Sequence, residues 1–193
     1  MTKDRIDFSL SYEEKHALLS MARNALEEFL GDKKAKSEQF DADIFSERRG
    51  AFVTLHKKGE LRGCIGYVLA YKPLRQAVRE MAIAASHDPR FDPVEANELN
   101  DIDIEISVLS PLSEIRDMSE IEIGRHGIYI KNGARSGLLL PQVATHYNWD
   151  KEMFLRQTCR KAGLAQKAWQ EKETVIKIFS AQVFGEKEEA PVN

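Results

Sequence analysis

The chain has 193 residues, of which 42% are hydrophobic and 31% are charged. This composition is typical of a folded globular protein and excludes an intrinsically disordered one. The length supports one core, or two small lobes that share a core, but not two ordinary independent domains. The formal net charge of -3 argues against nucleic acid as the main partner, because binding phosphate backbones requires a surplus of Lys and Arg on one face.

No segment approaches the roughly 18 consecutive apolar residues of a membrane span. The charged residues 1–5 are followed by no apolar run of signal-peptide length, so we expect a cytoplasmic protein that does not contact a membrane. The two cysteines, Cys64 and Cys159, fit no disulfide framework of secreted proteins, so both are expected to be reduced thiols.

The first predicted element is a helix that begins at the capping-box sequence 11–14 and ends at Gly31. Its apolar residues follow the helical period, and they are Leu18, Met21, Ala22, Ala25 and Phe29. The polar residues 32–49 are predicted to form a connecting loop.

A β-hairpin is predicted next, with strands at 51–56 and 61–67 around a turn at 57–60. A helix follows, with Pro73 in its first turn and an apolar stripe that extends to Ala85. This helix has to end before residues 87–93, because the two prolines of that polar segment are incompatible with a continuing helix.

Residues 102–108 alternate Ile or Val with polar residues, which predicts a strand with one buried face. Further strands are predicted at 121–123, 127–130, 138–140 and 175–179, with turns at 132–133 and 136–137. One helix is predicted to start near Pro141, and a second helix is predicted to be capped by Asp150 and to end at Gly163. A charged tail is predicted from Gly185. Together these elements predict one α/β domain of the α+β type over residues 1–193, with a mainly antiparallel sheet flanked by helices.

The segment 62–66, Arg-Gly-Cys-Ile-Gly, is the main local sign of a functional site. Glycine weakens a strand unless a bulge, a bend or the close approach of another group requires it, and here Gly63 and Gly66 bracket Cys64. In a functional interpretation, Cys64 is a nucleophile or a ligand, and Arg62 binds an anion or activates the thiol. In the alternative interpretation, Cys64 is a small buried residue where backbones approach, which is the commoner role of a free cysteine.

A catalytic cysteine requires a base within about 3 Å. If the hairpin turn has two residues, 58–59, then His56 points to the face opposite Cys64; if the loop has three residues, Phe52 lies opposite Cys64 and His56 lies about 13 Å along the strand. Either register excludes His56, so the base has to come from elsewhere. The candidates, which the sequence does not rank, are Glu105, His87, His126 and His146.

The sequence contains no histidine pair at metal-ligand spacing on a helix and no paired-cysteine motif, so no metal or other cofactor is expected. Asp88 and Arg90 form either a polar pair at a cleft or part of a solvated loop. Gln142, beside an apolar run, is the polar group there that can recognise a ligand. Tyr147 and Trp149 either cover a pocket or seal the edge of a core.

Four motifs occur in order along the chain: residues 61–66 (Leu-Arg-Gly-Cys-Ile-Gly), 88–91 (Asp-Pro-Arg-Phe), 137–143 (Gly-Leu-Leu-Leu-Pro-Gln-Val) and 158–164 (Thr-Cys-Arg-Lys-Ala-Gly-Leu). Through them nearly the whole chain resembles the AMMECR domain family. The resemblance implies an α/β fold of two unequal lobes, the larger formed by both chain ends around an antiparallel sheet and the smaller by the middle of the chain. It implies no agreed activity, but prokaryotic members of this size resemble one component of a system that also contains a Memo-like protein and a radical SAM enzyme.

Three functions stay open at this point. The first is an enzyme or enzyme subunit that acts on an unknown small molecule or protein and whose cleft binds an anionic or amide-bearing ligand. The second is a non-catalytic module that docks a partner enzyme with the same surface, and the third is an RNA-associated accessory protein, which the net charge disfavours. The expected ligand-binding residues are Arg62, Gly63, Gly66, Asp88, Arg90 and Gln142, and the expected catalytic residues are Cys64 and Glu105.

Overall fold

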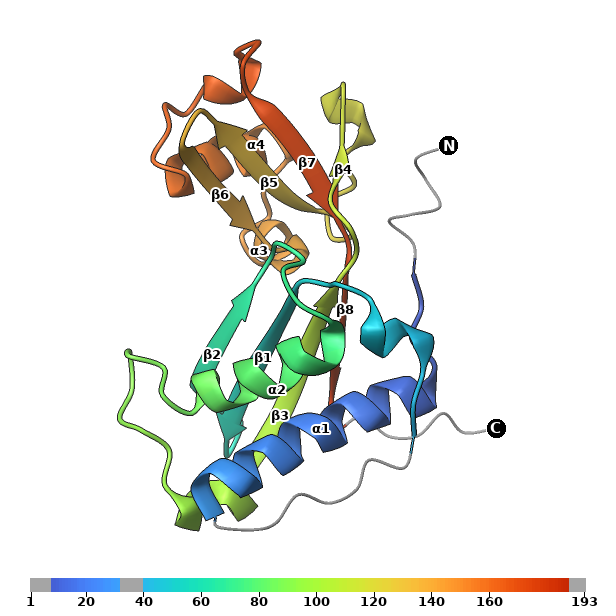
Figure 1. The fold of residues 1–193 in the computed structure, drawn as a ribbon. Coiled ribbons are helices and arrows are strands. Elements are labelled where there is room, and N and C mark those ends of the chain that lie inside the picture. Colours follow the sequence, from blue (N-terminus) through green and yellow to red (C-terminus); the bar gives the residue numbers. More distant parts are fainter. Residues whose placement is uncertain (1–7, 32–39, 188–193) are drawn as a thin grey trace. The chain divides into compact units, whose positions relative to one another are not determined.

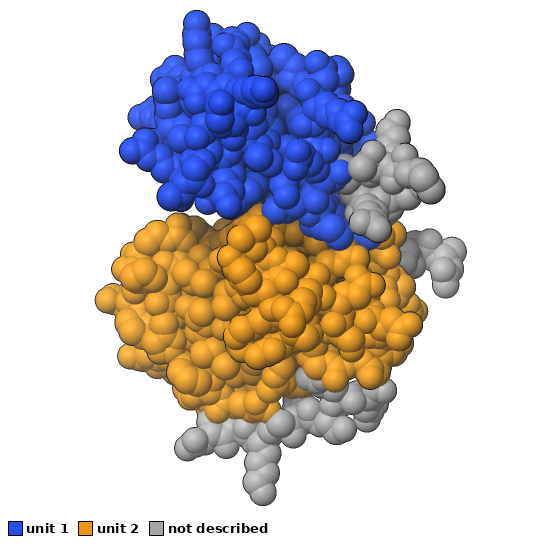
Figure 2. All heavy atoms as spheres, turned by 45° about the horizontal axis from the view of Figure 1, so that its top comes forward, with its two compact units in different colours: residues 1–8, 110–181 blue, residues 9–109, 182–193 orange. Residues whose placement is uncertain are grey.

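The computed structural model describes residues 8–31 and 40–187. The chain divides into two compact units (Figure 2): unit 1 comprises residues 1–8 and 110–181, and unit 2 comprises residues 9–109 and 182–193. The described residues form two sheets of four strands each, whereas the sequence predicted one sheet. The predicted fold class is confirmed, because strands that pair antiparallel are flanked by helices in both sheets.

Unit 2 is built on a sheet with the strand order β2-β1-β3-β8, with α1 and α2 on one of its faces (Figure 1). In chain order its elements are α1 (Tyr12–Gly31), η2 (Asp43–Ser46), β1 (Ala51–Lys57), β2 (Glu60–Tyr67), α2 (Leu74–Ala85), η3 (Ala96–Asp101), β3 (Ile102–Leu109) and β8 (Ala181–Gly185). The predicted capping box is present, because the Ser11 hydroxyl accepts from Glu14 N–H at 3.2 Å and the Glu14 carboxylate accepts from Ser11 N–H at 2.7 Å.

The two faces of this sheet differ in burial. Ala51, Val53 and Leu55 of β1 are fully buried, and α2 packs on this strand, whereas the alternating residues Phe52 and Thr54 are only half-buried. Strand β3 repeats the pattern, with isoleucines toward the helices and polar residues on the other face. The face that α1 and α2 leave uncovered is called the open face of unit 2 below.

The hairpin between β1 and β2 has the expected two-residue turn, in which Lys58 and Gly59 both have positive φ, at 53° and 84°. The pairing is interrupted by a β-bulge, because His56 pairs with Leu61 but Leu55 pairs with Gly63. The extra residue in β2 is Arg62. The expectation that a two-residue turn places His56 and Cys64 on opposite faces is therefore wrong, since the bulge returns Cys64 to the face of His56 and Thr54.

Unit 1 is built on a sheet with the strand order β4-β7-β5-β6, and α4 packs against β5 and β6. Its elements are β4 (Ser113–Glu114), η4 (Met118–Glu120), β5 (Gly127–Asn132), β6 (Arg135–Leu139), α3 (Pro141–His146), α4 (Lys151–Lys161), η5 (Ala168–Gln170) and β7 (Val175–Phe179). The predicted cap of α4 is confirmed, because Asp150 accepts from Met153 N–H at 2.7 Å. Among the described residues, no helix has the length and apolar character needed to cross a membrane.

Several sequence predictions were wrong in detail. Residues 121–123 form no strand, because a capped 3-10 turn ends at Glu120 and Gly124 turns the chain with a φ of 85°. The predicted turn at 136–137 lies inside β6, where Gly137 is needed because Ala162 N lies 2.6 Å from the position of a Cβ. Strands β4 and β8 were not predicted. Residues 32–39 of the predicted loop and 188–193 of the predicted tail lie outside the described residues.

Candidate functional site

The side chain of Cys64 lies on the open face of unit 2, in the edge strand β2. Its neighbour across the hairpin is Thr54, whose hydroxyl donates to the Cys64 Sγ at 3.2 Å. Cys64 is half-buried and free, so its thiol is neither sealed in the core nor part of a disulfide. Cys64 is therefore not one of the fully buried core residues of unit 2, and its role as a nucleophile or ligand stays a prediction.

The main chain of Cys64 is held from the free edge of β2 by the loop after α2. The N–H of Cys64 donates to Asp88 Oδ2 at 2.9 Å, and its C=O accepts from Arg90 Nη2 at 3.3 Å. In an antiparallel pair, every second residue points both main-chain groups away from its partner strand. Asp88 and Arg90 thus replace the missing neighbouring strand at Cys64 and protect this edge.

The hydrogen bonds of Asp88 and Arg90 to the Cys64 main chain are called the clamp on Cys64 below. Asp88 lies at its centre and is 2% exposed. Besides the Cys64 N–H, its carboxylate accepts from the Arg90 N–H at 3.1 Å and from Arg90 Nη2 at 2.6 Å. These hydrogen bonds, led by those of the Arg90 guanidinium, hold the pKa of Asp88 well below its usual range although burial opposes the shift. The Arg90 side chain is 58% exposed, and its guanidinium lies 5.6 Å from the centroid of the Phe91 ring.

Arg62 is committed to contacts within the protein. Its Nε and Nη2 donate to the two Glu98 oxygens at 3.1 and 2.9 Å, and its Nη1 and Nη2 donate to the carbonyls of Asp92 and Pro93 at 2.7 and 3.2 Å. Together with Lys57, which binds the same carboxylate at 2.7 Å, Arg62 lowers the pKa of Glu98 to about 2. These hydrogen bonds of the Arg62 guanidinium fasten the bulge of β2 to the segment before β3. Arg62 therefore has a structural role, in place of the ligand-binding role that we expected.

We predict that Arg62→Lys lowers the free energy of unfolding by about 1–3 kcal/mol, because a lysine cannot reproduce the fork on Glu98 and both carbonyl hydrogen bonds. The stability that ionised Glu98 provides is present above the usual glutamate pKa of about 4.3 and is lost as the pH falls toward about 2. Urea titrations at several pH values measure both effects. An unchanged stability would restore the ligand-binding interpretation of Arg62.

Protein atoms approach both glycines of the motif. A Cβ on Gly63 would lie 2.1 Å from the carbonyl oxygen of Ala85, at the end of α2, and a Cβ on Gly66 would lie 2.3 Å from the Phe52 ring. Gly63 therefore faces α2 instead of the ligand that we expected there. Gly66, which was also expected to bind a ligand, faces an aromatic ring on the paired strand, so protein atoms fill this position too.

Glu105 lies in one row with Cys64 and Thr54 across the strands β2, β1 and β3. Thr54 pairs with Cys64 on one side and with Glu105 on the other, so the three side chains share the open face of unit 2. Two strand spacings separate Cys64 from Glu105 by about 10 Å between Cα atoms, so a group bound above Thr54 can contact both side chains. Glu105 has no hydrogen bond or ion pair in the structure of residues 8–31 and 40–187.

The other candidate bases take different positions. His87 lies at the end of α2, where its ring contacts the Ser86 hydroxyl at 2.9 Å and the Phe29 ring at 5.2 Å between centroids. His126 and His146 belong to unit 1, as does Gln142, which is exposed near the start of α3. The structure of unit 2 thus brings Cys64 and Glu105 together with Asp88 and Arg90, and the expected role of Gln142 stays a prediction.

Sequence reasoning did not find Thr54 or Glu98. Thr54 could have been placed beside Cys64 only if the bulge had been known, because one extra residue decides which β1 residue lies opposite. Glu98 lies 36 residues beyond Arg62, and no local pattern connects the two. Among the described residues, no group of three or more His, Cys, Asp or Glu side chains is arranged to hold a metal ion.

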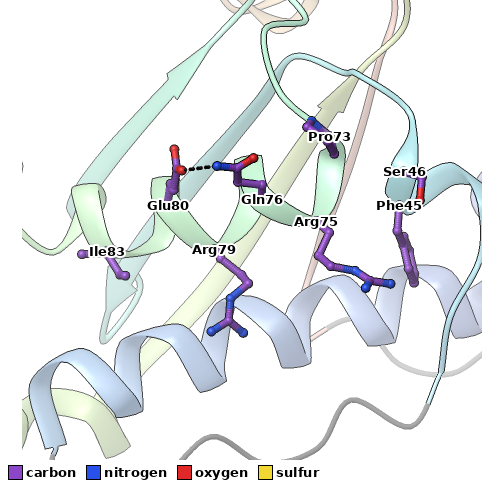
Figure 3. A pocket seen from close by; sticks show the side chains of 8 residues that line it. All are labelled: Phe45, Ser46, Pro73, Arg75, Gln76, Arg79, Glu80 and Ile83. Carbon is purple, nitrogen blue, oxygen red and sulfur yellow. Dashed lines mark hydrogen bonds between the residues drawn. The ribbon is translucent and has the colours of Figure 1, made fainter.

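A hollow of about 530 Å³ lies on the outer side of α2, beside Phe45 of η2 (Figure 3). Its charged lining groups are engaged within the protein, since Arg79 pairs with Glu28 at 3.0 Å and Glu80 pairs with Lys72 at 2.5 Å. Its lining contains no thiol and no histidine. The open face around Cys64 is therefore the better candidate for chemistry.

We predict that Cys64 reacts with iodoacetamide in the native protein and that Cys159 does not. Cys159 is fully buried in α4, and burial raises the pKa of its thiol, which removes both access and thiolate. Intact-mass measurement should show one added carbamidomethyl group under native conditions and two in urea. Equal reaction of both cysteines in the native state would contradict this prediction.

The comparisons with known proteins identify the family. A sequence model of the AMMECR1 family matches residues 19–184, and the chain belongs to this family. A protein of Methanothermobacter thermautotrophicus is 48% identical over 185 residues, which cover 92% of this chain and 96% of that protein. Protein MK0488 of Methanopyrus kandleri is 45% identical over 194 residues, which cover 95% and 94%.

A solved structure extends this similarity to the fold. The crystal structure of the uncharacterised protein PH0010 from Pyrococcus horikoshii matches with a TM-score of 0.81 at 36% sequence identity, covering 93% of this chain and 95% of that chain. The family and the fold expected from the motifs are thereby confirmed. The names of these relatives specify no reaction.

Proposed function

We propose that this AMMECR1-family protein is the ligand-binding component of a modification system that includes a Memo-like protein and a radical SAM enzyme. The association follows from the resemblance of the chain to prokaryotic family members. One observation supports this choice of binding surface: Cys64, Thr54 and Glu105 form a row across three strands on the open face of unit 2.

The geometry around Cys64 supports this choice of surface. A working thiol has to be accessible and held in place, and Cys64 meets both conditions because it is half-buried while Asp88 and Arg90 fix its main chain. Glu105 supplies a carboxylate that no other described side chain occupies. A ligand with an N–H group can donate to Glu105 while another part of it reaches the thiol.

The experiment is a ligand survey with matched variants. Small molecules that co-purify with the protein are identified by mass measurement, and a metabolite library is screened by thermal shift. Ligands of the open face should stabilise the parent protein but not Glu105→Gln or Cys64→Ala, and they should stabilise Glu114→Gln as well as the parent, since Glu114 is an exposed acid of unit 1. Ligands that stabilise all four proteins equally would refute the proposal.

A docking module is the second candidate, and exposed apolar side chains on the same face favour it. Leu61 is 42% exposed and pairs with His56, which shares the face of Thr54, and Val183 of β8 is 40% exposed. Val183 points away from the helices, because its neighbour Phe184 is buried near Lys15 of α1. If Leu61→Ser and Val183→Ser abolish binding of the Memo-like or radical SAM protein while Cys64→Ala does not, docking is the function.

A further inference from the structure

One face of the unit 1 sheet is not covered by α4. Gly137 is approached by Ala162, which follows directly after α4, and Gly137 pairs with Ile130, so these residues mark the face that α4 covers. Side chains alternate along a strand, which places Tyr129 and Lys131 of β5 on the other face. Their partners in β7 point the same way, Lys177 opposite Tyr129 and Val175 opposite Lys131.

This face combines an aromatic ring with two cations. Lys131 is exposed, and Tyr129, Val175 and Lys177 are half-buried. Within the part of the chain that the structure describes, neither lysine has an ion pair and the Tyr129 hydroxyl has no hydrogen bond. The acid that faces this group is Glu114 of β4, which lies opposite Lys177 in register but forms no ion pair with it.

The charge of the chain is divided unequally. Residues 110–181 contain 11 Lys and Arg against 8 Asp and Glu, whereas the rest of the chain contains 17 against 23. The net charge of -3 is therefore the sum of a net positive charge on unit 1 and a net negative charge on the rest of the chain. The overall charge of the chain therefore does not disfavour the binding of nucleic acid to unit 1, because phosphate binding depends on local charge.

Single-stranded nucleic acids bind where bases can stack on an aromatic side chain and phosphates can reach cations. Lys177 is the direct cross-strand neighbour of Tyr129, and Lys131 is two residues along β5, about 7 Å away. The carboxylates of an acidic peptide could use both lysines, but a nucleic acid presents a stacking base beside each phosphate and so matches the ring and the cations together. We propose that this face binds a single-stranded nucleic acid, with one base on Tyr129 and neighbouring phosphates on Lys131 and Lys177.

The test is fluorescence anisotropy of the full chain with labelled single-stranded RNA and DNA of about 12 nucleotides, titrated at low salt. Tyr129→Ala should weaken binding roughly tenfold to hundredfold, and Tyr129→Phe, which keeps the ring, should bind like the parent. Lys131→Ala with Lys177→Ala should reduce the slope of log K against log salt by about 1.4, at about 0.7 per phosphate contact. The control is Arg160→Ala with Lys161→Ala, which removes two exposed cations from α4, on the covered face, and should change the slope little.

Several outcomes would overturn the proposal. One is the absence of binding at about 0.2 mM protein in low salt, since non-specific sites already bind in that range. Another is binding that Tyr129→Ala leaves intact, or equal competition by polyglutamate, because either result indicates a purely electrostatic surface. A preference for RNA over DNA would show that the sugar hydroxyl is also contacted, and equal affinity would leave base and phosphate as the recognised groups; both results support the proposal.

Discussion

Asp88→Ala is expected to lower the free energy of unfolding by about 2–3 kcal/mol, the upper part of the range for leaving a buried hydrogen-bond donor without its partner, because the Arg90 side chain is 58% exposed and water can solvate its charge. The alanine leaves the Cys64 N–H without its acceptor and the Arg90 guanidinium without its counter-ion, both at the edge of the sheet. Asp88→Asn should lose less, because an amide oxygen can still accept from Cys64. Urea denaturation followed by circular dichroism measures the differences.

The same contacts predict a pH dependence. The pKa of Asp88 is lowered in the folded state by Arg90 and by two N–H donors, so the unfolded chain binds the proton more readily. The resulting stability is fully present above the usual aspartate range of about 4 and is lost as the pH falls below it. Asp92→Asn is the control, since Asp92 is an exposed acid of the same loop. If Asp88→Ala is as stable as Asp92→Asn, the clamp on Cys64 is not a structural determinant.

Gly63→Ala should destabilise the fold by about 3 kcal/mol, at the upper end of what an overpacked site costs. The new methyl group would lie 2.1 Å from a main-chain oxygen of α2, and a helix end cannot move aside as a flexible side chain can. Gly66→Ala should also cost about 3 kcal/mol, because the new methyl group would lie 2.3 Å from the Phe52 ring and 2.4 Å from the main-chain oxygen of Ala51, which the sheet holds in place.

Gly31→Ala is the control for both substitutions. At the end of α1 the added methyl would lie 3.6 Å from Leu99 Cδ1, an ordinary contact, and alanine is a better helix former than glycine. Thermal melts and urea titrations of the three variants give the comparison. If Gly63→Ala is as stable as Gly31→Ala, then α2 does not pack on β2 as described here.

Local chemistry explains which elements could be predicted from the sequence. The capping box at residues 11–14 and the Asp150 cap combine a donor and an acceptor within four residues, so the sequence alone specifies them. The strand 102–109 was visible because one of its faces is buried. Residues 121–123 show the same alternation, yet the capped turn before them and Gly124 after them leave no room for a strand.

The candidate site was predictable in part. The two glycines marked the segment correctly, because each is required by the close approach of another group, but the sequence could not reveal that both groups belong to the protein. The bulge at Arg62 determines which side chains face Cys64, and Arg62 pairs with Glu98 far along the chain, which no local sequence pattern reveals. Glu105 could be proposed from its residue type, and only the pairing through Thr54 places it in the Cys64 row.

The rate of native alkylation at Cys64 tests most directly whether the open face of unit 2 is the binding surface. The rate is measured by mass spectrometry with the protein alone, with each ligand from the thermal-shift screen, and with the proposed Memo-like and radical SAM partners. We expect a bound ligand or partner to slow the alkylation of Cys64 several-fold in the parent protein. In Glu105→Gln, we expect the small ligand to leave the alkylation rate unchanged. A ligand or partner that binds tightly while alkylation of Cys64 proceeds at the unliganded rate would contradict the account.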